Sequence, residues 1–421
     1  MRVLIVGAGI MGITTAYFLQ RQGCEVVLLE QQDGPAQGAS QANGSFFSAG
    51  LSAPWSAPGA IGMALRAQFD PSAAFRWKPD FTWRQATWML QSMRECHPKR
   101  YSLNRARLTR MAAYAQDCLQ HIEADLSIDY DRSRQGLMQL YREAVPQSMV
   151  DAHLAYLDTM NIRARYLTPD EVREQEPALR RSTPDLFGAI HLPDDLSGDC
   201  AHFAQKLLGA VRARGATFVC NAKVQEVRID ASGPSRGRVS GLATTQGDFD
   251  ADAYVFAAGV ESAVLLRGLA NLPIYPIKGY SVTAHIRNAD AAPRHSMFDF
   301  KAKTGMARMG ERMRISGIAE VAGYGLQISR ARCEQLMKAF EEAFPDAIDA
   351  ASATFWTGLR PATPDGVPCV CTTDFRNLYI NAGHGGSGWS MSCGSGKLMA
   401  DIVLGRTTDI DAQDYALLRR R

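Results

Sequence analysis

The sequence lacks the long apolar runs, the strong charge excess and the leader segment that would indicate three other classes of protein. No apolar run reaches the roughly 18 residues that a membrane-spanning helix needs. The net charge is only +3 over 421 residues, which is too small to imply a nucleic-acid partner. The first predicted strand starts at residue 2, which leaves no room for a signal peptide. We therefore expect a cytoplasmic protein, either free or peripheral on the cytoplasmic face of the inner membrane.

The cysteines are too scattered to predict a disulfide framework. They number nine, at Cys24, Cys96, Cys118, Cys200, Cys220, Cys333, Cys369, Cys371 and Cys393. Cys369 and Cys371 are the only close pair, and neither a C-x-x-C partner nor a neighbouring histidine accompanies them. We expect reduced thiols and no metal site.

Internal repeats, charge blocks and low-complexity tails are also absent from the chain. The composition, 46% hydrophobic and 21% charged, is typical of a soluble globular protein. At 421 residues the chain is too long for a single hydrophobic core, so we expect two domains.

The most informative segment is residues 1–30, which predict a strand, a glycine turn, a helix and a second strand. The turn, Gly7-Ala8-Gly9-Ile10-Met11-Gly12, has the pattern G-x-G-x-x-G. In this context the pattern indicates a dinucleotide-binding unit, with a glycine-rich turn of an ordinary α/β protein as the alternative. Gly7 allows the tight turn, Gly9 lets the backbone approach a pyrophosphate, and Gly12 lets the helix sit close to the strand. The pyrophosphate would lie at the helix N-terminus, where N–H groups and the dipole favour anions.

Glu30 ends the second strand, eighteen residues after Gly12. Its carboxylate can accept a hydrogen bond from a ribose hydroxyl, and it would repel the 2′-phosphate of NADP. The segment therefore predicts NAD or FAD, and it does not decide between them.

The strands of the nucleotide-binding sheet are not contiguous in the sequence. Buried strands of the same kind recur near 217–257 and 378–382, whereas residues 275–325 alternate as antiparallel strands do. We expect an α/β fold with a discontinuous Rossmann-like domain and an α+β domain that is inserted in pieces and contains an antiparallel sheet.

Further segments, in order over nearly the whole chain, carry a resemblance to a known family. They are Ser40-Gln41-Ala42-Asn43-Gly44, APWSAPG at 53–59, Gly198-Asp199-Cys200, Ala257-Ala258-Gly259, YPIKGYS at 275–281, FWTGLRP at 355–361, TPDG at 363–366, and Gly383-His384-Gly385 with Gly388-Trp389. Together with the N-terminal turn they resemble the D-amino-acid dehydrogenase branch of the FAD-dependent D-amino-acid oxidase (glycine oxidase) superfamily.

The resemblance implies FAD as cofactor and oxidative deamination of a small D-amino acid, D-alanine-like or D-proline-like. Hydride would pass to flavin N5, and the electrons would pass to a respiratory, quinone-like acceptor. It also implies a division of the chain. The FAD-binding domain would comprise 1–80, 195–270 and 355–421, and the substrate-binding domain 81–194 and 271–354.

The cofactor-binding residues that we predict come from four parts of the chain. Polar and backbone groups of the loop after Glu30 suit the pyrophosphate and ribityl chain, Val224 resembles valines that bracket the adenine, and the turn 385–388 opens a helix whose N–H groups would face flavin N1 and O2. The full set is Gly7, Gly9, Ile10, Met11, Gly12, Glu30, Gln31, Ser40, Ala42, Asn43, Gly44, Val224, Ala258, Gly259, Gly385, Gly386, Ser387 and Gly388.

Arg360, Tyr280 and His384 are the predicted catalytic residues. The resemblance places the substrate-carboxylate arginine in the G-L-R-P setting of Arg360, whose two parallel donors suit a carboxylate. The alternative is a surface ion pair. Tyr280 is a second candidate for the carboxylate, or a core tyrosine. His384 is either a structural or flavin-contacting residue or a general base, although hydride transfer from a neutral amine needs no strong base.

Two rival functions remain open at this point. One is a true oxidase of the same fold that uses O₂, and the other is a non-catalytic FAD-binding subunit of a larger dehydrogenase complex.

The segments 44–48 and 298–308 depart from the pattern of the resembled enzymes. These segments would lie over the flavin and the substrate side chain, so the preferred amino acid stays open.

Residues 66–110 have a composition that allows two interpretations. They contain ten Lys/Arg against three Asp/Glu, with six Phe and Trp interleaved. Basic plus aromatic is the composition of an interfacial membrane contact. In the other interpretation the aromatic rings belong to the core and the cations are solvated.

Overall fold

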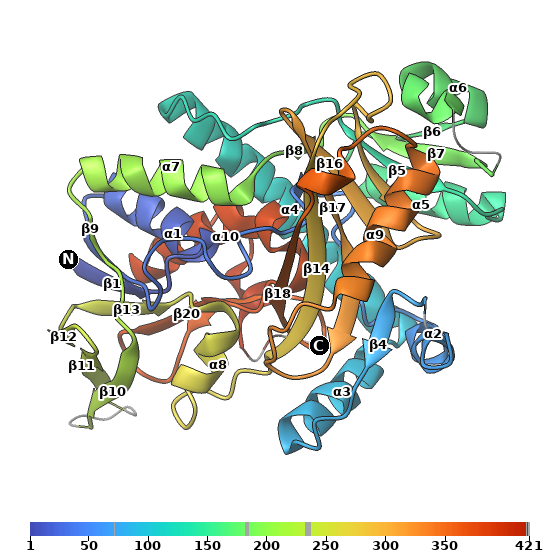
Figure 1. The fold of residues 1–421 in the computed structure, drawn as a ribbon. Coiled ribbons are helices and arrows are strands. Elements are labelled where there is room, and N and C mark those ends of the chain that lie inside the picture. The colour runs from blue at the N-terminus through green and yellow to red at the C-terminus, as the bar shows by residue number, and fades with distance from the viewer. Residues whose placement is uncertain (71, 182–184, 232–236, 418, 420–421) are drawn as a thin grey trace.

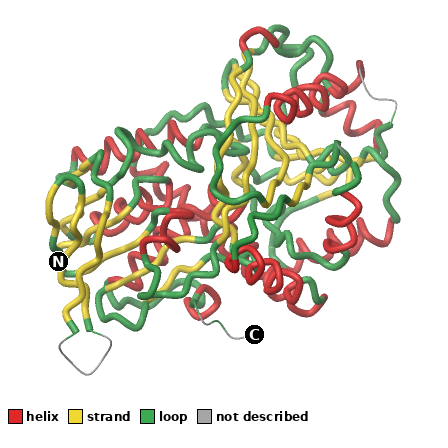
Figure 2. The backbone as a smooth tube through the Cα atoms, turned by 60° about the horizontal axis from the view of Figure 1, so that its bottom comes forward, coloured by secondary structure: helices red, strands yellow, loops and turns green. Residues whose placement is uncertain are grey.

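The computed structural model of the chain describes residues 1–70, 72–181, 185–231, 237–417 and 419. It contains two large sheets that occupy different parts of the molecule, with helices packed against each (Figures 1 and 2). Among the described helices, none is both long enough and apolar enough to cross a membrane.

The first sheet has six strands in the order β19-β20-β13-β1-β2-β9. Its strands are β1 (Arg2–Val6), β2 (Glu25–Leu29), β9 (Thr217–Val219), β13 (Ala253–Phe256), β19 (Cys369–Thr372) and β20 (Leu378–Ala382). All neighbours are parallel except β19 and β20. Val3 and Ile5 point into one apolar cluster, whereas Leu4 and Val6 point into another. Both faces are therefore covered, as a parallel sheet requires.

Helices cover one face of this sheet and a small sheet covers the other (Figure 1). The helices are α1 (Ile10–Arg21), α4 (Pro98–Asp125), α7 (Cys200–Ala213) and α10 (Gly388–Val403). The opposite layer comprises β10 (Val224–Asp230), β11 (Arg238–Thr244), β12 (Gly247–Phe249) and the short α8 (Ser262–Leu265).

The second sheet has nine strands, in the order β18-β14-β17-β16-β15-β5-β7-β6 with β4 paired to β17. Its strands are β4 (Phe75–Trp77), β5 (Leu137–Tyr141), β6 (Arg165–Leu167), β7 (Gly188–Leu192), β14 (Tyr275–His285), β15 (Ser296–Asp299), β16 (Thr304–Met309), β17 (Arg312–Val321) and β18 (Thr354–Ala362). Most pairs are antiparallel. Helix α9 (Arg330–Ala343) packs on β14, β16 and β17.

The remaining elements connect the two sheets or lie at the periphery. They are β3 (Phe46–Phe47), β8 (Leu196–Ser197), α2 (Ala60–Ala67), α3 (Trp83–Glu95), α5 (Gln147–Thr159) and α6 (Pro169–Gln175). The short strands β3 and β8 pair with each other.

The predicted fold class, a discontinuous Rossmann-like unit with an antiparallel-rich second sheet, is confirmed. The predicted domain boundaries stay a prediction. Two strands inside the ranges assigned to the FAD-binding domain, β4 and β18, pair in the nine-stranded sheet. β18 pairs with β14 along nine residues, so residues 354–362 bring the second sheet to the nucleotide-binding unit.

Candidate active site

The glycine turn after β1 has no room for side chains at two positions. Gly7 has φ +101°, and a Cβ there would lie 2.8 Å from the carbonyl oxygen of Ala257. A Cβ on Gly12 would lie 1.9 Å from the carbonyl oxygen of Gly7. The N-terminus of α1 can therefore sit directly against β1, which leaves its first N–H groups facing the space beyond the turn.

Glu30, at the end of β2, lies beside this turn. Its carboxylate accepts hydrogen bonds from the N–H groups of Ala8, at 2.8 Å, and Gln32, at 3.0 Å. Both Glu30 and the adjacent Gln31 line the cavity described below. The carboxylate is thus held in place at the position where a ribose would lie, although the ribose contact itself stays a prediction.

Glu30→Ala is expected to weaken FAD binding while leaving the fold intact. A lost hydrogen bond to a charged group is worth about 1.5–3 kcal/mol, which corresponds to a rise in Kd of roughly ten- to a hundredfold. The measurement is flavin content after dialysis, with Kd from reconstitution of the apoprotein. Glu25→Ala is the matched control, because Glu25 is exposed at the far end of β2 and outside the cavity. Full flavin retention in Glu30→Ala would contradict the assigned role.

The loop at residues 40–44 is held between the two sheets. Ser40 Oγ accepts a hydrogen bond from the N–H of Ile10 at 3.1 Å, which ties the loop to the start of α1. Ser281 Oγ on β14 donates to the carbonyl of Ala42 at 2.7 Å, and Arg314 Nη1 on β17 donates to the carbonyl of Asn43 at 3.1 Å. The second sheet therefore positions the loop that we predict to hold the cofactor.

A second helix N-terminus faces the same space as that of α1. Helix α10 follows the turn Gly385–Ser387 and carries no acidic residue in its first turn. The two helices cross closely, because Gly396 packs against the backbone of Thr14, whose hydroxyl also donates to the carbonyl of Ser392 at 3.0 Å. Two positive helix ends are thus brought to one site.

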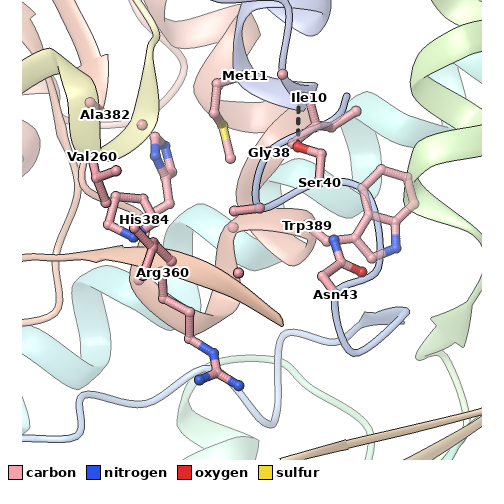
Figure 3. Close-up of a pocket in the computed structure, with 18 of the residues that line it drawn as sticks. Ile10, Met11, Gly38, Ser40, Asn43, Val260, Arg360, Ala382, His384 and Trp389 are labelled. Carbon is pink, nitrogen blue, oxygen red and sulfur yellow. Dashed lines mark hydrogen bonds between the residues drawn. The ribbon is translucent and has the colours of Figure 1, made fainter. Parts of the chain in front are cut away.

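These elements enclose a cavity of about 1120 Å³. It extends from Glu30 and Val224 at one end to Arg360 at the other. Every predicted cofactor-binding and catalytic residue lines it except Gly12, which packs behind the turn. Figure 3 shows Met11, Ser40 and Asn43 on one side of the cavity and Ala382, His384 and Arg360 on the other.

The guanidinium of Arg360 lies in this cavity without an acidic partner. It donates to the carbonyl oxygens of Ile318, at 2.9 Å, and Gly317, at 3.3 Å, and lies over the ring of Trp55 at 5.4 Å. Burial lowers the pKa of Arg360 to about 10, and no Asp or Glu in the described part of the chain opposes that shift. An unpaired cation in a largely enclosed site favours an anionic ligand.

The backbone that holds this guanidinium is strained. Ile318 has φ +58°, which a β-branched residue rarely adopts, and it lies in a bulge where β17 has one residue more than β14. A conformation of this kind costs about 1–3 kcal/mol and persists where the surrounding structure requires it. Here the bulge turns the carbonyls of Gly317 and Ile318 toward Arg360. A Cβ on the facing Gly279 would lie 2.1 Å from Nη1, so the glycine leaves the guanidinium its space.

Tyr280 borders the cavity, but its hydroxyl points elsewhere. It donates a 3.0 Å hydrogen bond to the buried carboxylate of Glu320, which also accepts from Arg332. Its ring belongs to the core cluster beneath α9. Because successive residues of a strand face opposite sides, Tyr280 lies on the other side of the sheet from Gly279 and Arg360. The geometry therefore favours the core-tyrosine alternative over a carboxylate ligand.

His384 is fully buried in a polar chain that continues to α1. Its Nε2 lies 2.8 Å from Ser395 Oγ, which donates to Asn381 at 2.6 Å, and Asn381 donates to Thr15 at 3.0 Å. Because the serine proton goes to Asn381, His384 donates from Nε2 and is held as a neutral tautomer. Burial lowers the pKa of His384 to about 3. These observations favour a structural role over that of a general base.

The two shifted pKa values predict the pH dependence of carboxylate binding. Arg360 is cationic below about pH 10, so affinity for acetate should be constant from about pH 6 to 9 and fall about tenfold per pH unit above 10. His384 stays neutral over this range, so no change should appear near its ordinary pKa of 6.5. The measurement is the perturbation of the flavin spectrum by acetate. An inflection near 6.5 would mean that a histidine controls binding.

Several cavity residues were not among the individually predicted site residues, although Phe46, Phe298 and Phe300 belong to the segments 44–48 and 298–308 that we expected over the flavin and the substrate. Trp55 lies over Arg360, and the carbonyls of Gly317 and Ile318 orient it. Leu51 and Leu326 also line the cavity and lie outside every predicted segment. The sequence could have indicated a functional role for Trp55, because a single tryptophan between two prolines in a polar loop has no helical or strand periodicity to explain it. No feature of the sequence indicates that the carbonyls of Gly317 and Ile318 orient Arg360.

Comparison with known proteins identifies the family of the chain. The sequence matches the FAD dependent oxidoreductase (DAO) family over residues 2–402. The chain belongs to this family. It is an FAD-dependent oxidoreductase, and the prediction of FAD as its cofactor is confirmed.

Solved structures of the family share the fold over the whole chain. Glycine oxidase from Bacillus cereus ATCC 14579 has a TM-score of 0.75 at 19% identity, with 100% of this chain and 99% of that chain covered. Glycine oxidase from Geobacillus kaustophilus has a TM-score of 0.74 at 23% identity, with 100% and 99% covered. L-proline dehydrogenase from P. horikoshii has a TM-score of 0.74 at 16% identity, with 99% and 96% covered. At these identities the likeness shows the fold.

The cavity of this FAD-dependent oxidoreductase fits its cofactor. The glycine turn excludes side chains where a pyrophosphate must approach, and the cavity is long enough to join Glu30 to the turn at 385–388. The helix ends of α1 and α10 offer N–H groups to a phosphate and to the negative charge that develops on a reduced flavin.

Proposed function

We propose that this oxidoreductase converts a D-amino acid with an apolar side chain to the imino acid, which water hydrolyses to a 2-oxo acid and ammonium. The electrons would leave through a respiratory, quinone-like acceptor. The observation that carries the proposal is the unpaired guanidinium of Arg360 at the end of the cavity opposite Glu30. It suits the carboxylate of an amino acid, and the similar structures include glycine oxidases and an L-proline dehydrogenase.

The lining of the cavity supports an uncharged substrate side chain. Among the described lining residues the only other Lys or Arg is Lys223, which lies beside Val224 at the nucleotide end. A second carboxylate, as in aspartate or glutamate, would therefore lack a counter-charge. The ring of Trp55 faces Arg360, and the rings of Phe298 and Phe300 also line the cavity, which suits an apolar side chain such as that of alanine or proline.

The chain itself would bind and orient the substrate and would not act as a strong base. Arg360 offers two donors that fix both ends of a carboxylate, so they set the direction of the Cα–H bond as well as the affinity. His384 stays neutral and committed to Ser395, so it is not poised to take a proton. Bound FAD supplies the acceptor for the two electrons and the hydrogen that leave Cα.

The choice of the D-enantiomer and of the acceptor rests on the sequence resemblance. The motifs from 40–44 to 383–389 resemble D-amino-acid dehydrogenases in order along the chain. An oxidase would have the same fold and would use the same arginine. Geometry therefore does not distinguish an oxidase from a dehydrogenase, and an experiment must.

The test is product formation by the purified holoenzyme with matched D- and L-amino acids. We expect ammonium and 2-oxo acid from D-alanine or D-proline analogues in the presence of an artificial quinone, and little turnover with O₂ alone. Steady hydrogen peroxide release at the rate seen with the quinone would overturn the dehydrogenase assignment in favour of an oxidase. Turnover of only the L-enantiomers would overturn the assigned stereochemistry.

A further inference from the structure

Helix α2 and the segment leading into α3 expose apolar side chains that no described residue of the chain covers. Helix α2 has no buried residue, and its Ile61, Met63 and Leu65 are 42–60% exposed. An isolated helix of eight residues is not stable in water on its own. Exposed apolar groups gathered in this way indicate an interaction surface.

Helix α3 carries a row of apolar side chains on its solvent-facing side. Its inward side is anchored by polar bonds, from Gln85 to the hydroxyl of Tyr275 at 2.9 Å and from Trp88 Nε1 to the carbonyl of Ala362 at 2.8 Å. Its outward stripe is Trp83, Ala86, Leu90 and Met93, at helical spacing and exposed. A stripe of this kind facing outward implies a non-aqueous partner.

Three aromatic side chains of this region are almost fully exposed to solvent. Phe69, Phe81 and Trp83 are 90%, 95% and 80% exposed. Phe81 has φ +55°, a strained conformation for a bulky residue, and the turn that holds it is fixed by Asp80, which accepts hydrogen bonds from Thr82. The other three aromatic residues of the segment, Phe75, Trp77 and Trp88, pack against a core cluster, so the core interpretation holds for these three rings and membrane contact stays a prediction.

Cations outnumber acids in the segment that carries these rings. Arg66, Lys78, Arg94 and Lys99 are exposed, and none forms an ion pair with a described acid. Of the three acids in the segment, Asp70 accepts a hydrogen bond from Ser72 and Asp80 accepts from Thr82 and Tyr275. Glu95 pairs with Arg100 and accepts from Asn104. Residues 66–110 carry an excess of seven cations in a chain whose total is +3, so the rest of the chain is net negative.

We propose that α2, β4 and α3 form a docking surface for an anionic lipid bilayer. Its apolar members are Ile61, Met63, Leu65, Phe69, Phe81, Trp83, Leu90 and Met93, and its cationic members are Arg66, Lys78, Arg94 and Lys99. These elements lie together at one corner of the molecule (Figure 1). Exposed aromatic rings on elements that also carry exposed cations without an ion pair suit the interfacial region of a membrane, where rings enter the headgroup boundary and cations pair with lipid phosphates.

The docking surface adjoins the mouth of the cavity. Helix α2 begins five residues after Trp55, and Arg84 of α3 lies over the ring of Tyr324, close to Leu326 in sequence. Trp55 and Leu326 are about half exposed, and both line the cavity. Docking would thus bring the mouth to the lipid, where an apolar quinone is dissolved. This consequence rests on the proposed function, whereas the docking itself does not.

The test is co-sedimentation of the holoenzyme with vesicles of phosphatidylcholine alone or mixed with phosphatidylglycerol. We expect binding to the anionic vesicles that weakens at physiological ionic strength, because exposed charges are screened within about 8 Å there. A triple variant, Phe69→Ser with Phe81→Ser and Trp83→Ser, should lose binding. A quadruple variant, with Gln in place of Arg66, Lys78, Arg94 and Lys99, should bind at least about tenfold more weakly.

The matched control replaces four exposed cations elsewhere, Lys206, Arg212, Arg238 and Arg376, by Gln and should bind as the wild type does. Flavin content and reduction by substrate in solution report folding and are expected to be unchanged in all variants. No binding to anionic vesicles at low salt would overturn the proposal. Equal loss in the control variant, or self-association through this surface without vesicle binding, would overturn it as well.

Discussion

Arg360→Lys is expected to raise KM strongly and to slow flavin reduction by roughly tenfold or more. Lysine keeps the charge but loses the two parallel donors that fix a carboxylate. A lost hydrogen bond between charged groups is worth about 1.5–3 kcal/mol, and here it also sets the orientation of Cα–H. Flavin content should be unchanged, because Arg360 contacts β17 and Trp55 and would serve the substrate. Anaerobic stopped-flow with the best amino acid measures both effects.

Arg308→Lys is the matched control for this substitution. Arg308 lies on β16 of the same sheet, bonds the carbonyl of Gly310 at 3.3 Å and does not line the cavity. Its lysine variant should reduce at the wild-type rate. Wild-type kinetics in Arg360→Lys would mean that another group holds the carboxylate.

Gly12→Ala is expected to abolish FAD retention and to lower Tm strongly. The added Cβ would lie 1.9 Å from the carbonyl oxygen of Gly7, and backbone atoms cannot yield as a flexible side chain can. Overpacking of this kind costs typically 1–3 kcal/mol and more where backbone must move. Because α1 would be pushed from β1, its N-terminus would leave the pyrophosphate position. Flavin content and thermal unfolding provide the measurements.

Gly209→Ala is the control for the glycine substitution. Gly209 lies within α7, and a Cβ there would meet nothing within 4 Å. Alanine in a helix is favoured over glycine by about 0.5–1 kcal/mol, so this variant should be as stable as the wild type or more so. A Gly12→Ala variant that retained FAD and Tm would show that the close packing of α1 is not needed.

The sequence carried enough local information to predict the nucleotide-binding unit. The glycine turn, the strand before it and the acid at Glu30 lie within thirty residues, and each has a steric or electrostatic reason that needs no partner from elsewhere. The alternation in 275–325 likewise predicted antiparallel pairing of β14, β16 and β17.

Long-range placement of single side chains was not predictable in the same way. Arg360 was predicted from the resemblance, but its unpaired state depends on where β18 sits against the bulge at Ile318. Tyr280 shows the limit most clearly. It is one residue from Gly279, and the alternation of a strand turns it away from the guanidinium toward Glu320 on the far side.

The orientation of the aromatic residues in the docking surface was also not predictable from the sequence. Composition alone allowed the aromatic residues of 66–110 to be either buried or exposed. Only the folded chain shows that Phe75, Trp77 and Trp88 pack inward while Phe69, Phe81 and Trp83 project outward. The side of a helix that faces the core is set by its neighbours, which a local pattern does not contain.

The most direct test of amino-acid oxidation at Arg360 is the anaerobic visible spectrum of the purified holoenzyme during addition of matched D- and L-enantiomers. Our account predicts that the flavin band is bleached by a D-amino acid with an apolar side chain, and that the L-enantiomer and D-aspartate leave it unchanged. Bound flavin that no amino acid bleaches would contradict the account and favour a non-catalytic FAD-binding subunit.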